Sequence, residues 1–324
     1  MEKEVSLERH TYRYPKLMKF LEKFRWREFL PLIGLAFMTC IFIVLTDGRL
    51  ITSWNLAISQ IFVIAISATG VFFIMTMGSL DFSQGSILGL SSIVVCLLSQ
   101  YSIPLAIVGG IITGALIGMI NGYFSVFRKI RSFIVTICTM FLFRGLIKFL
   151  TTKAPIPASF DLINMDTLPL KIICTLVVLI VFLLIYRYTK FGIHLKAIGS
   201  GEKAARFGGV KTQKMKFLVF VLAGALTGFA AFINSMKIGS VTAAGGNQLE
   251  TQIMIALVLG GMPISGGAKV KFNQIIIGSF MYVILNSGLT MCGVPTQLLQ
   301  LIEGIIFLFF VAFFADRKLL HIIK

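Results

Sequence analysis

Along the chain, long apolar runs alternate with short polar segments that are mostly basic. Each run has about 20 residues, which is enough for an α-helix to cross a hydrocarbon core of about 30 Å. The runs are apolar on every side, whereas a helix packed on a soluble core keeps a polar face. The short alternating segments of a membrane β-barrel are not seen in the sequence. The pattern therefore predicts an all-α, polytopic membrane protein.

Ten spans can be drawn through these runs, and some of them are expected to be broken helices. They form one transmembrane domain over 29–315, between a cytoplasmic or interfacial segment over 1–28 and a cytoplasmic tail over 316–324. The predicted spans are 29–46, 55–75, 84–99, 103–127, 131–150, 169–188, 215–236, 252–265, 272–292 and 296–315.

The segment before the first span is partly amphipathic. Its apolar side chains on one helical face are Leu17, Phe20, Leu21 and Phe24, with lysine and arginine around them. Such a pattern is typical of a helix that lies in the membrane interface. A solvated tail that only contributes positive charge is the alternative, and the sequence leaves both open.

The cations between the spans predict the orientation of the chain. With the N-terminus in the cytoplasm, the inner connections include 127–131, 187–216 and 268–271, which carry many of the lysines and arginines. The outer connections then hold little besides Arg49, Lys153 and Lys237. Because cytoplasmic loops of membrane proteins are enriched in lysine and arginine, we expect both termini to face the cytoplasm.

Composition agrees with a membrane protein and argues against several other classes. Only 13% of the residues are charged and 57% are hydrophobic, with a mean hydropathy of +0.92, whereas soluble proteins have roughly 25% charged residues. The net charge of +17 is spread between the spans, so it indicates contact with anionic lipid and not nucleic acid. The five cysteines have no CxxC spacing, and the three histidines form no HExxH pattern. We expect no metal site and no catalytic residue.

The stretch TMGSLDFSQGS places a carboxylate between two apolar segments. Asp81 lies between Gly78 and Gly85, where the helix can break, and GGMPISGG at 260–267 is a second such stretch. Broken helices occur at membrane depth around buried or watery cavities. Asp81 is therefore a candidate for the wall of a solute path or gate. The alternative is a cytoplasmic turn in which Asp81 caps a helix that begins near Ser83.

Other polar residues fall deep within the predicted spans. Arg144, Asn286 and Glu303 lie at similar depths in the outer half of the membrane, with Gln300 one turn from Glu303. An unpaired charge in a membrane is costly, so Arg144 and Glu303 are expected to pair with each other or to face a wet cavity. The pair would either clamp two helices or line the solute path. The predicted path residues are Asp81, Ser83, Gln84, Arg144, Asn286, Gln300 and Glu303.

The longest inner connection, 190–216, is too polar to enter the membrane and too long for a simple turn. Within it, GEKAARFGG has good helix formers between glycines and predicts a short helix. A short, glycine-bounded helix in a cytoplasmic loop can dock on a partner, with a solvated basic loop as the alternative. The residues predicted to couple the chain to a partner over 190–214 are Gly201, Glu202, Lys203, Ala204, Ala205, Arg206, Gly208 and Gly209.

Four stretches of the chain carry a resemblance to a known family. They read TMGSLDFSQGSILGLSS, FIVTICTMFLFRGLIKFLT, FGIHLKAIGSGEKAARFGGVKTQKMKFLVFVLAGALTGFAAFI and IALVLGGMPISGG. In order and spacing they resemble the ribose-type permeases of bacterial ABC importers, over roughly residues 50–317. The chain departs from the usual pattern at AKVKFNQ after Gly267 and at Gln84, which bears on the solute and on the symmetry of a permease pair.

The resemblance implies a permease subunit of the bacterial cytoplasmic (inner) membrane that imports a monosaccharide or similar small polar solute. It implies as partners a second permease subunit, identical or different, a cytoplasmic ATPase and an extracytoplasmic solute-binding protein. ATP and Mg²⁺ would be bound by the ATPase, with no cofactor in this chain. The resemblance also places the helix that couples to the ATPase at 202–206.

The sequence contains no phosphate-binding loop, because GMPISGGAK lacks the lysine directly after the second spaced glycine. ATP hydrolysis would therefore require a separate subunit. A stand-alone transporter driven by protons or sodium is the alternative function. It would need coupled carboxylates at mid-membrane, and the candidates are few: Asp81 and Glu303. The identity of the solute does not follow from the sequence.

Overall fold

The computed structural model describes residues 26–314. The predicted interfacial helix around 17–24 and the predicted cytoplasmic tail both lie outside these residues. The segments that correspond to the predicted spans are the α-helices α2 (Trp26–Leu45), α4 (Trp54–Thr76), α5 (Gln84–Ser99), α6 (Ile103–Gly122), α7 (Ser132–Leu150), α9 (Leu168–Tyr188), α12 (Thr212–Ile238), α13 (Leu249–Leu259), α14 (Asn273–Met291) and α15 (Thr296–Phe314).

Short elements join these helices. A π-helical turn, η1 (Tyr123–Phe127), extends α6, and β1 (Ile156–Pro157) pairs antiparallel with β2 (Ser240–Val241). The short connecting helices are α3 (Arg49–Thr52), α8 (Phe160–Asn164), α10 (Lys190–Ser200) and α11 (Glu202–Phe207). The prediction of an all-α membrane protein is thus confirmed in outline.

Within the described residues, six helices are long and apolar enough to cross a membrane, namely α4, α6 with η1, α7, α9, α12 and α14. Helices α2, α5, α13 and α15 are apolar but have shorter apolar segments. The number of ten spans therefore stays a prediction. The predicted span 252–265 was too long, because α13 ends at Leu259. Gly261 at φ +86° and Pro263 follow directly and end the helix.

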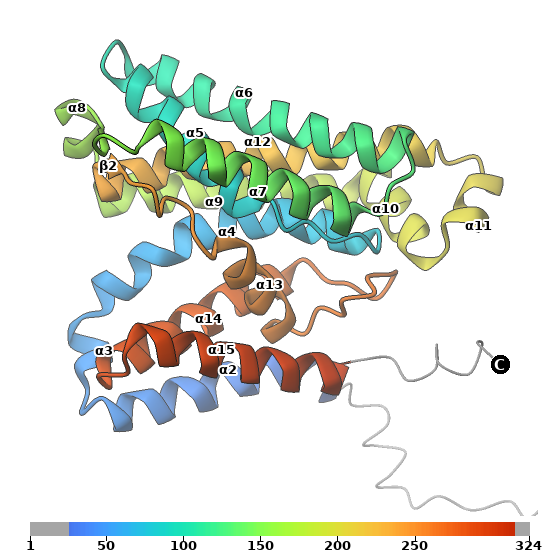
Figure 1. The fold of residues 1–324 in the computed structure, drawn as a ribbon. Helices are drawn as coiled ribbons and strands as arrows, with labels where there is room; N and C mark the ends of the chain where they lie inside the picture. Colours follow the sequence, from blue (N-terminus) through green and yellow to red (C-terminus); the bar gives the residue numbers. More distant parts are fainter. Residues whose placement is uncertain (1–25, 315–324) are drawn as a thin grey trace, which may run out of the picture.

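Helix α4 is the centre of the fold. Its residues from Ile61 to Thr76 are all buried, and none of them is charged. In Figure 1, α5, α6, α7 and α12 lie on one side of α4, and α2, α14 and α15 lie on the other. An all-round apolar helix of this kind belongs inside a bundle, so α4 joins the two groups of helices.

Glycines allow α6 and α12 to cross at backbone contact. A Cβ atom added to Gly114 would lie 2.1 Å from the carbonyl oxygen of Gly224, and one added to Gly228 would lie 2.1 Å from that of Gly110. Gly118 meets the Phe220 carbonyl in the same way, at 2.3 Å. Small residues four apart are the usual means of close helix packing in membranes. The crossing fixes α12, which carries part of the site described below.

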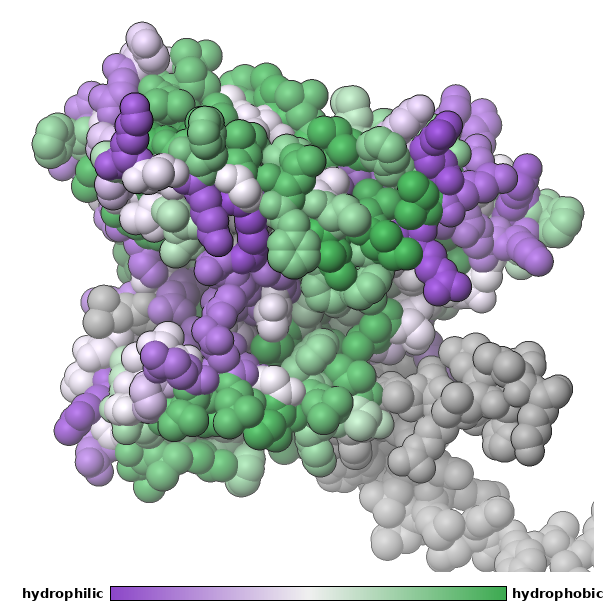
Figure 2. Space-filling view, viewed as in Figure 1, coloured by the Kyte–Doolittle hydropathy of each residue, from purple (hydrophilic) through white to green (hydrophobic). Residues whose placement is uncertain are grey.

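Many large apolar side chains are exposed on the outer surface of the described residues. Figure 2 shows broad hydrophobic areas on both groups of helices, with hydrophilic side chains at the two ends and in a recess between the groups. Exposed apolar residues include Leu116 on α6, Phe141 on α7 and Leu308 on α15. Exposed apolar area on this scale is expected of a surface that faces lipid or another membrane subunit.

Helix α10 was not expected from the sequence, which predicted a polar connection with one short helix. Thr189 caps α10 by accepting a hydrogen bond from the Phe191 amide at 3.2 Å. Gly192 lets the helix approach α9, because a Cβ there would lie 1.8 Å from the Tyr186 carbonyl oxygen. The predicted short helix at 202–206 is confirmed as α11, and Gly201 alone separates it from α10.

We expect α10 and α11 to face the cytoplasm, because the cations of the chain gather in this connection. Ser200 is exposed at the end of α10. In a cysteine-free background, a Ser200→Cys variant should react with a membrane-impermeant maleimide only after the cells are opened. A cysteine in place of exposed Lys153, in the opposite connection, should react in intact cells. Labelling of Ser200→Cys in intact cells would show that the predicted orientation is wrong.

Candidate functional site

A cavity of about 400 Å³ opens between α4, α5, α12, α13 and the segment that joins α12 to α13. It lies at the end of the bundle that the charge pattern predicts to face outward. Its lining comprises Ser59, Gln60, Val63, Ile64, Leu88, Ser92, Asn234, Lys237, Ile238, Ser240, Val241, Thr242, Ala244, Gly245, Gly246, Asn247, Leu249, Gln252 and Asn286.

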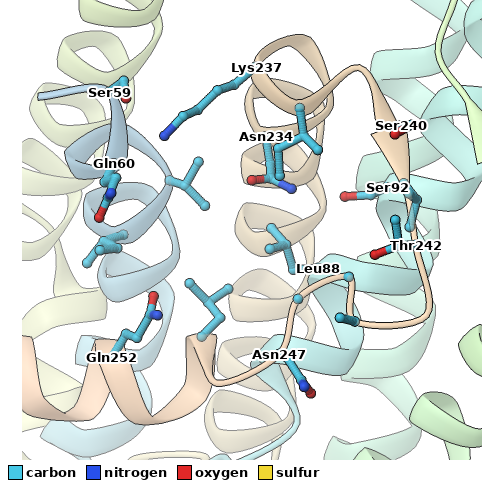
Figure 3. Close-up of a pocket in the computed structure, with 18 of the residues that line it drawn as sticks. Ser59, Gln60, Leu88, Ser92, Asn234, Lys237, Ser240, Thr242, Asn247 and Gln252 are labelled. Carbon is cyan, nitrogen blue, oxygen red and sulfur yellow. The ribbon is translucent and has the colours of Figure 1, made fainter. Parts of the chain in front are cut away.

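The cavity is lined by amide and hydroxyl groups and by some apolar side chains. Figure 3 shows Gln60 of α4, Asn234 of α12 and Gln252 of α13 arranged around the space. Lys237 reaches from the last turn of α12 toward α4 and is the one ionisable side chain among the lining residues described. Amides and hydroxyls both donate and accept hydrogen bonds, so the cavity suits an uncharged, hydroxylated molecule.

Close backbone contact holds the segment before α13 against α5. A Cβ atom on Gly89 would lie 2.6 Å from the carbonyl oxygen of Gly245, and one on Gly246 would lie 2.0 Å from that of Gly85. Gly246 also has φ +73°, a conformation that favours glycine. The four glycines thus allow this segment to form one wall of the cavity.

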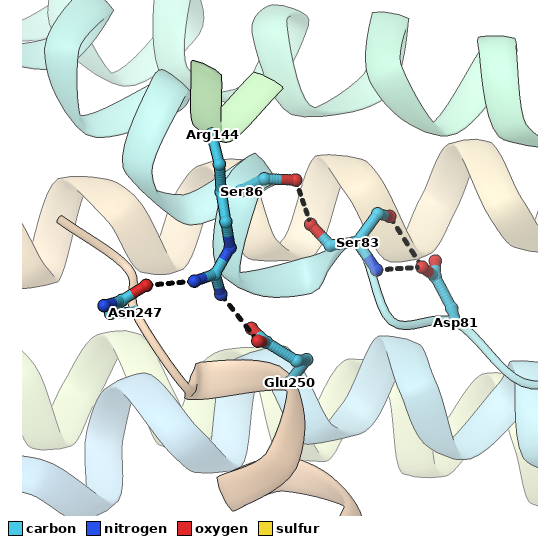
Figure 4. Close-up of polar contacts among 6 residues, drawn as sticks. All are labelled: Asp81, Ser83, Ser86, Arg144, Asn247 and Glu250. Carbon is cyan, nitrogen blue, oxygen red and sulfur yellow. Dashed lines mark hydrogen bonds and ion pairs between the residues drawn. The ribbon is translucent and has the colours of Figure 1, made fainter. Parts of the chain in front are cut away.

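Behind this wall, Arg144 of α7 binds one residue of this segment, Asn247, and one residue in the first turn of α13, Glu250. Its Nη2 atom lies 2.6 Å from Oε1 of Glu250, and its Nη1 atom donates to Oδ1 of Asn247. Figure 4 shows both contacts. The predicted pairing of Arg144 with Glu303 is therefore wrong. Glu250 is mostly buried, and the ion pair offsets the cost of placing either charge in the membrane.

Gly85 makes room for this pair. A Cβ atom at position 85 would lie 2.0 Å from Oε2 of Glu250 and 3.2 Å from Nη2 of Arg144. The first turn of α5 therefore packs directly against the charged groups, and the pair ties together α5, α7 and α13. From the sequence, Gly85 was predicted only as a position where the helix can break.

Glu303 has a different partner from the one predicted. Its Oε1 atom accepts a hydrogen bond from the Tyr282 hydroxyl at 2.9 Å, and Asn286 donates to the same hydroxyl at 3.3 Å. Asn286 also lines the cavity. The structure thus brings Asn286 and Glu303 together at the edge of the site, whereas Gln300 is exposed on α15.

Asp81 is buried in a polar network before α5. Its Oδ1 accepts from the Ser83 amide at 2.8 Å and from the Ser83 hydroxyl at 2.6 Å, and its Oδ2 accepts from Gln84 Nε2 at 2.7 Å. Asn121 of α6 donates to the Ser83 hydroxyl at 2.8 Å, and Thr227 of α12 donates to Gln84. Figure 4 shows Asp81 next to the start of α5.

These contacts bear on the two interpretations of Asp81. The carboxylate binds the backbone just before α5, as expected of a residue that fixes a helix start, and it is 1% exposed. Asp81, Ser83 and Gln84 are absent from the lining of the described cavity. Their role in a solute path stays a prediction, since other states of the protein would have to open a route to them.

Helix α11 exposes most of its predicted coupling residues. Ala205 is buried, whereas Lys203, Ala204 and Arg206 are exposed. Glu202 binds Lys216 of α12, with 2.8 Å between Oε2 and Nζ. Phe207, which the sequence analysis had not selected, is 92% exposed. A fully exposed aromatic side chain among charges at one end of the molecule indicates a contact surface.

Sequence reasoning missed most of the cavity. Gln60, Asn234 and Lys237 stand out as polar residues near the ends of apolar spans, and Gln252 begins the eighth predicted span. The amide side chains of Gln60, Asn234 and Gln252 within apolar spans are the sequence signal that could have identified this cavity. Among the residues that the structure describes, no three histidines, cysteines or acidic residues gather to hold a metal ion.

An apolar helical bundle with a polar cavity at one end defines the class only as far as a membrane protein that can bind a small polar molecule. Comparison with protein families specifies this class. The family model described as the permease component of a branched-chain amino acid transport system matches residues 55–311. The chain belongs to this family, which consists of permease components of transport systems. This membership supports the predicted function, a permease subunit, over the alternative of a stand-alone ion-coupled transporter.

Curated relatives extend along nearly the same length. The chain is 32% identical to the ribose import permease protein of Bacillus subtilis over 300 residues, which covers 89% of this chain and 92% of that protein. It is 24% identical to the xylose transport system permease protein of Haemophilus influenzae, over 88% of this chain and 95% of that protein. It is 27% identical to the galactofuranose transporter permease protein of Escherichia coli, over 82% of this chain and 80% of that protein. No solved structure matches the chain.

Proposed function

We propose that this chain is the permease subunit of an ATP-driven importer and that its solute is a neutral monosaccharide. The observation that carries the proposal is the chemistry of the cavity between α4, α5, α12 and α13. Its described lining offers amides from Gln60, Asn234 and Gln252 and hydroxyls from Ser92 and Thr242, without a carboxylate. Each of these groups can bind a sugar hydroxyl as donor or acceptor.

The family description and the relatives point to two different solutes, branched-chain amino acids and sugars. A zwitterionic amino acid needs an acceptor for its ammonium group, and a carboxylate is the strongest one. The described cavity lining has no carboxylate, and its one ionisable side chain is the cation Lys237. Desolvating the ammonium group there would be costly. The cavity therefore favours the sugar.

The partners follow from the proposed function. Transport against a gradient would be driven by a cytoplasmic ATPase that binds ATP and Mg²⁺ and docks on α11, since permeases of this family are components of larger systems. An extracytoplasmic binding protein would deliver the solute to the cavity. A second permease subunit would cover the recess between the two groups of helices (Figure 2). The location that fits these partners is the bacterial cytoplasmic membrane.

Uptake of labelled solutes by the complete transporter tests the proposal. Cells that express the whole system should accumulate at least one of ribose, xylose and galactofuranose, the sugars named for the relatives, and excess leucine should not compete. A Gln252→Leu variant removes one cavity amide at similar volume, so sugar uptake should fall by about fivefold or more. A Thr52→Val variant, at an exposed position outside the cavity, should keep wild-type uptake. Leucine uptake without sugar uptake would contradict the proposal.

Docking of the ATPase on α11 gives a separate prediction. Replacing Phe207 by serine removes an exposed aromatic side chain, so we expect the ATPase to bind about tenfold more weakly, as at an interface hot spot. Phe160, which is 85% exposed on α8, provides the matched control, because Phe160→Ser lies in a connection predicted to face outward. The measurement is the amount of ATPase that co-purifies with each variant. Equal co-purification of both variants would rule out α11 as the docking site.

A further inference from the structure

The inner end of α4 meets α10 and the connection between α13 and α14 at a single point, which we call the glycine junction. It consists of Gly199, Gly266, Gly267 and the backbone of Thr76. The Gly267 amide donates to the Thr76 carbonyl oxygen at 3.1 Å. A Cβ atom on Gly199 would lie 2.0 Å from that oxygen and 2.9 Å from the Gly267 nitrogen. Three separate parts of the chain are therefore in backbone contact.

The two other glycines of the junction are also favoured over other residues, Gly266 by lack of space and by its positive φ, and Gly267 by its positive φ alone. Gly266 has φ +68°, and a Cβ atom there would lie 2.2 Å from the Met75 carbonyl oxygen. Gly267 has φ +112°, and Gly78, which begins the segment that leads to Asp81, has φ +73°. Residues other than glycine rarely adopt these conformations. The backbone conformation at the junction therefore favours glycine, and the backbone segments pack closely at Gly199 and Gly266.

An aromatic cluster next to the junction joins the same elements. The ring of Phe191 on α10 packs edge-on against Phe73 of α4, with 5.5 Å between the ring centres. Tyr186 of α9 packs on Phe72 at 5.1 Å and donates its hydroxyl proton to the Val270 carbonyl oxygen at 3.1 Å. Lys196 of α10 lies 4.6 Å from the centre of the Tyr186 ring. These contacts make α10 stiffly attached to its neighbours.

Helix α4 and the helices on either side of the α13–α14 connection also line the cavity at the opposite end. Helix α4 ends at the junction with Thr76 and lines the cavity with Ser59 and Gln60. The connection that carries Gly267 leads from α13, which lines the cavity with Gln252, to α14, which does so with Asn286. A tilt of α4 against α13 at the inner end would therefore change the width of the cavity.

Helix α11, the proposed docking helix, begins three residues after Gly199. We propose that the glycine junction is where a displacement of α11 passes into α4 and the α13–α14 connection, with Gly199 as the positioning residue. This inference rests on the proposed docking of an ATPase on α11. Close packing makes such contacts switch between discrete arrangements without bending smoothly.

The test measures the movement of the cavity walls directly, without a solute. The complete transporter is prepared with the five native cysteines replaced and with spin labels at positions 60 and 252. The distance between the labels is measured before and after trapping with Mg-ATP and vanadate. We expect a shift in the otherwise unchanged protein and in a Ser200→Ala control, since Ser200 is exposed next to Gly199.

A Gly199→Ala variant should lose this shift, because its methyl group would overlap the Thr76 carbonyl. In a background without labels, where Gln60 and Gln252 are intact, Gly199→Ala should still co-purify with the ATPase and hydrolyse ATP, while transport per ATP hydrolysed falls about tenfold. A merely structural role would lower binding, hydrolysis and transport together. A wild-type shift in Gly199→Ala, or no shift in the unmutated complex, would overturn the proposal.

Should Gly199→Ala fail to assemble, Tyr186→Phe decides the question. It keeps the aromatic packing and removes the hydroxyl that donates to the Val270 carbonyl oxygen. We expect it to assemble normally with a smaller shift between the labels, and an unchanged shift would refute the inference. If no ATPase co-purifies even with the unmutated chain, the proposed function itself is wrong, which distinguishes that failure from a failure of the junction.

Discussion

Neutralising Arg144 or Glu250 alone will destabilise the protein more than neutralising both. The two groups form an ion pair at 2.6 Å with Glu250 mostly buried. Breaking a buried pair by removing one partner costs about 3–5 kcal/mol, because the other charge stays desolvated and unpaired. In the Arg144→Gln and Glu250→Gln double variant no charge remains at the site. Because the double loss should be smaller than either single loss, we expect a favourable interaction energy of at least about 3 kcal/mol between the two positions.

The measurement is the thermal unfolding of the detergent-solubilised wild type, both single variants and the double variant. A second cycle with Arg144→Gln and Glu303→Gln provides the control. Glu303 binds Tyr282 in another part of the molecule, so these two losses should add. Additive losses at Arg144 and Glu250, together with a strong interaction between Arg144 and Glu303, would contradict the structure described here.

The second large effect is expected where α6 crosses α12. In a Gly114→Ala variant the new Cβ atom would lie 2.1 Å from the Gly224 carbonyl oxygen, so the helices must move apart. Overpacking of this kind costs about 1–3 kcal/mol, and it would also displace Asn234 and Lys237 on α12. We expect less folded protein after heating and reduced uptake.

Gly145→Ala on α7 is the matched control for this prediction. It adds the same methyl group to a helix at a position with no atom within 4 Å, and alanine is the better helix former. Its stability should equal or exceed that of the wild type. Loss of folded protein in Gly145→Ala to the same extent as in Gly114→Ala would show that close packing at the crossing is not the cause.

Much of the secondary structure could be predicted because it follows from local pattern. The apolar runs mark the helices to within a few residues, apart from the end of α13, and the glycines around 202–206 mark α11. Helix α10 was missed because its sequence, KFGIHLKAIGS, is too polar for a span and only moderately helical. Thr189 is a local cap signal that the sequence does contain. The contact of Gly192 with the Tyr186 carbonyl of α9 depends on how the two helices pack, and the sequence does not reveal it.

The site could be predicted only in part, for the same reason. Arg144 and Glu303 were recognised as costly charges that need partners, which composition and span position are enough to show. The choice of Glu250 over Glu303 depends on Gly85 and Gly246, which let α5 and the segment before α13 come into backbone contact. Nothing in the order of residues reveals that approach.

By itself, the sequence determined that the chain is a helical membrane protein, where most helices lie, and which family it resembles. These follow from hydrophobicity and from motifs that depend on neighbouring residues. Only the tertiary structure decided which polar groups form the cavity, which charges pair, and that α10 reaches α4 through Gly199. The reason is physical: the energy of a polar group in a membrane depends on the partner within hydrogen-bonding distance, and packing between distant helices sets that distance.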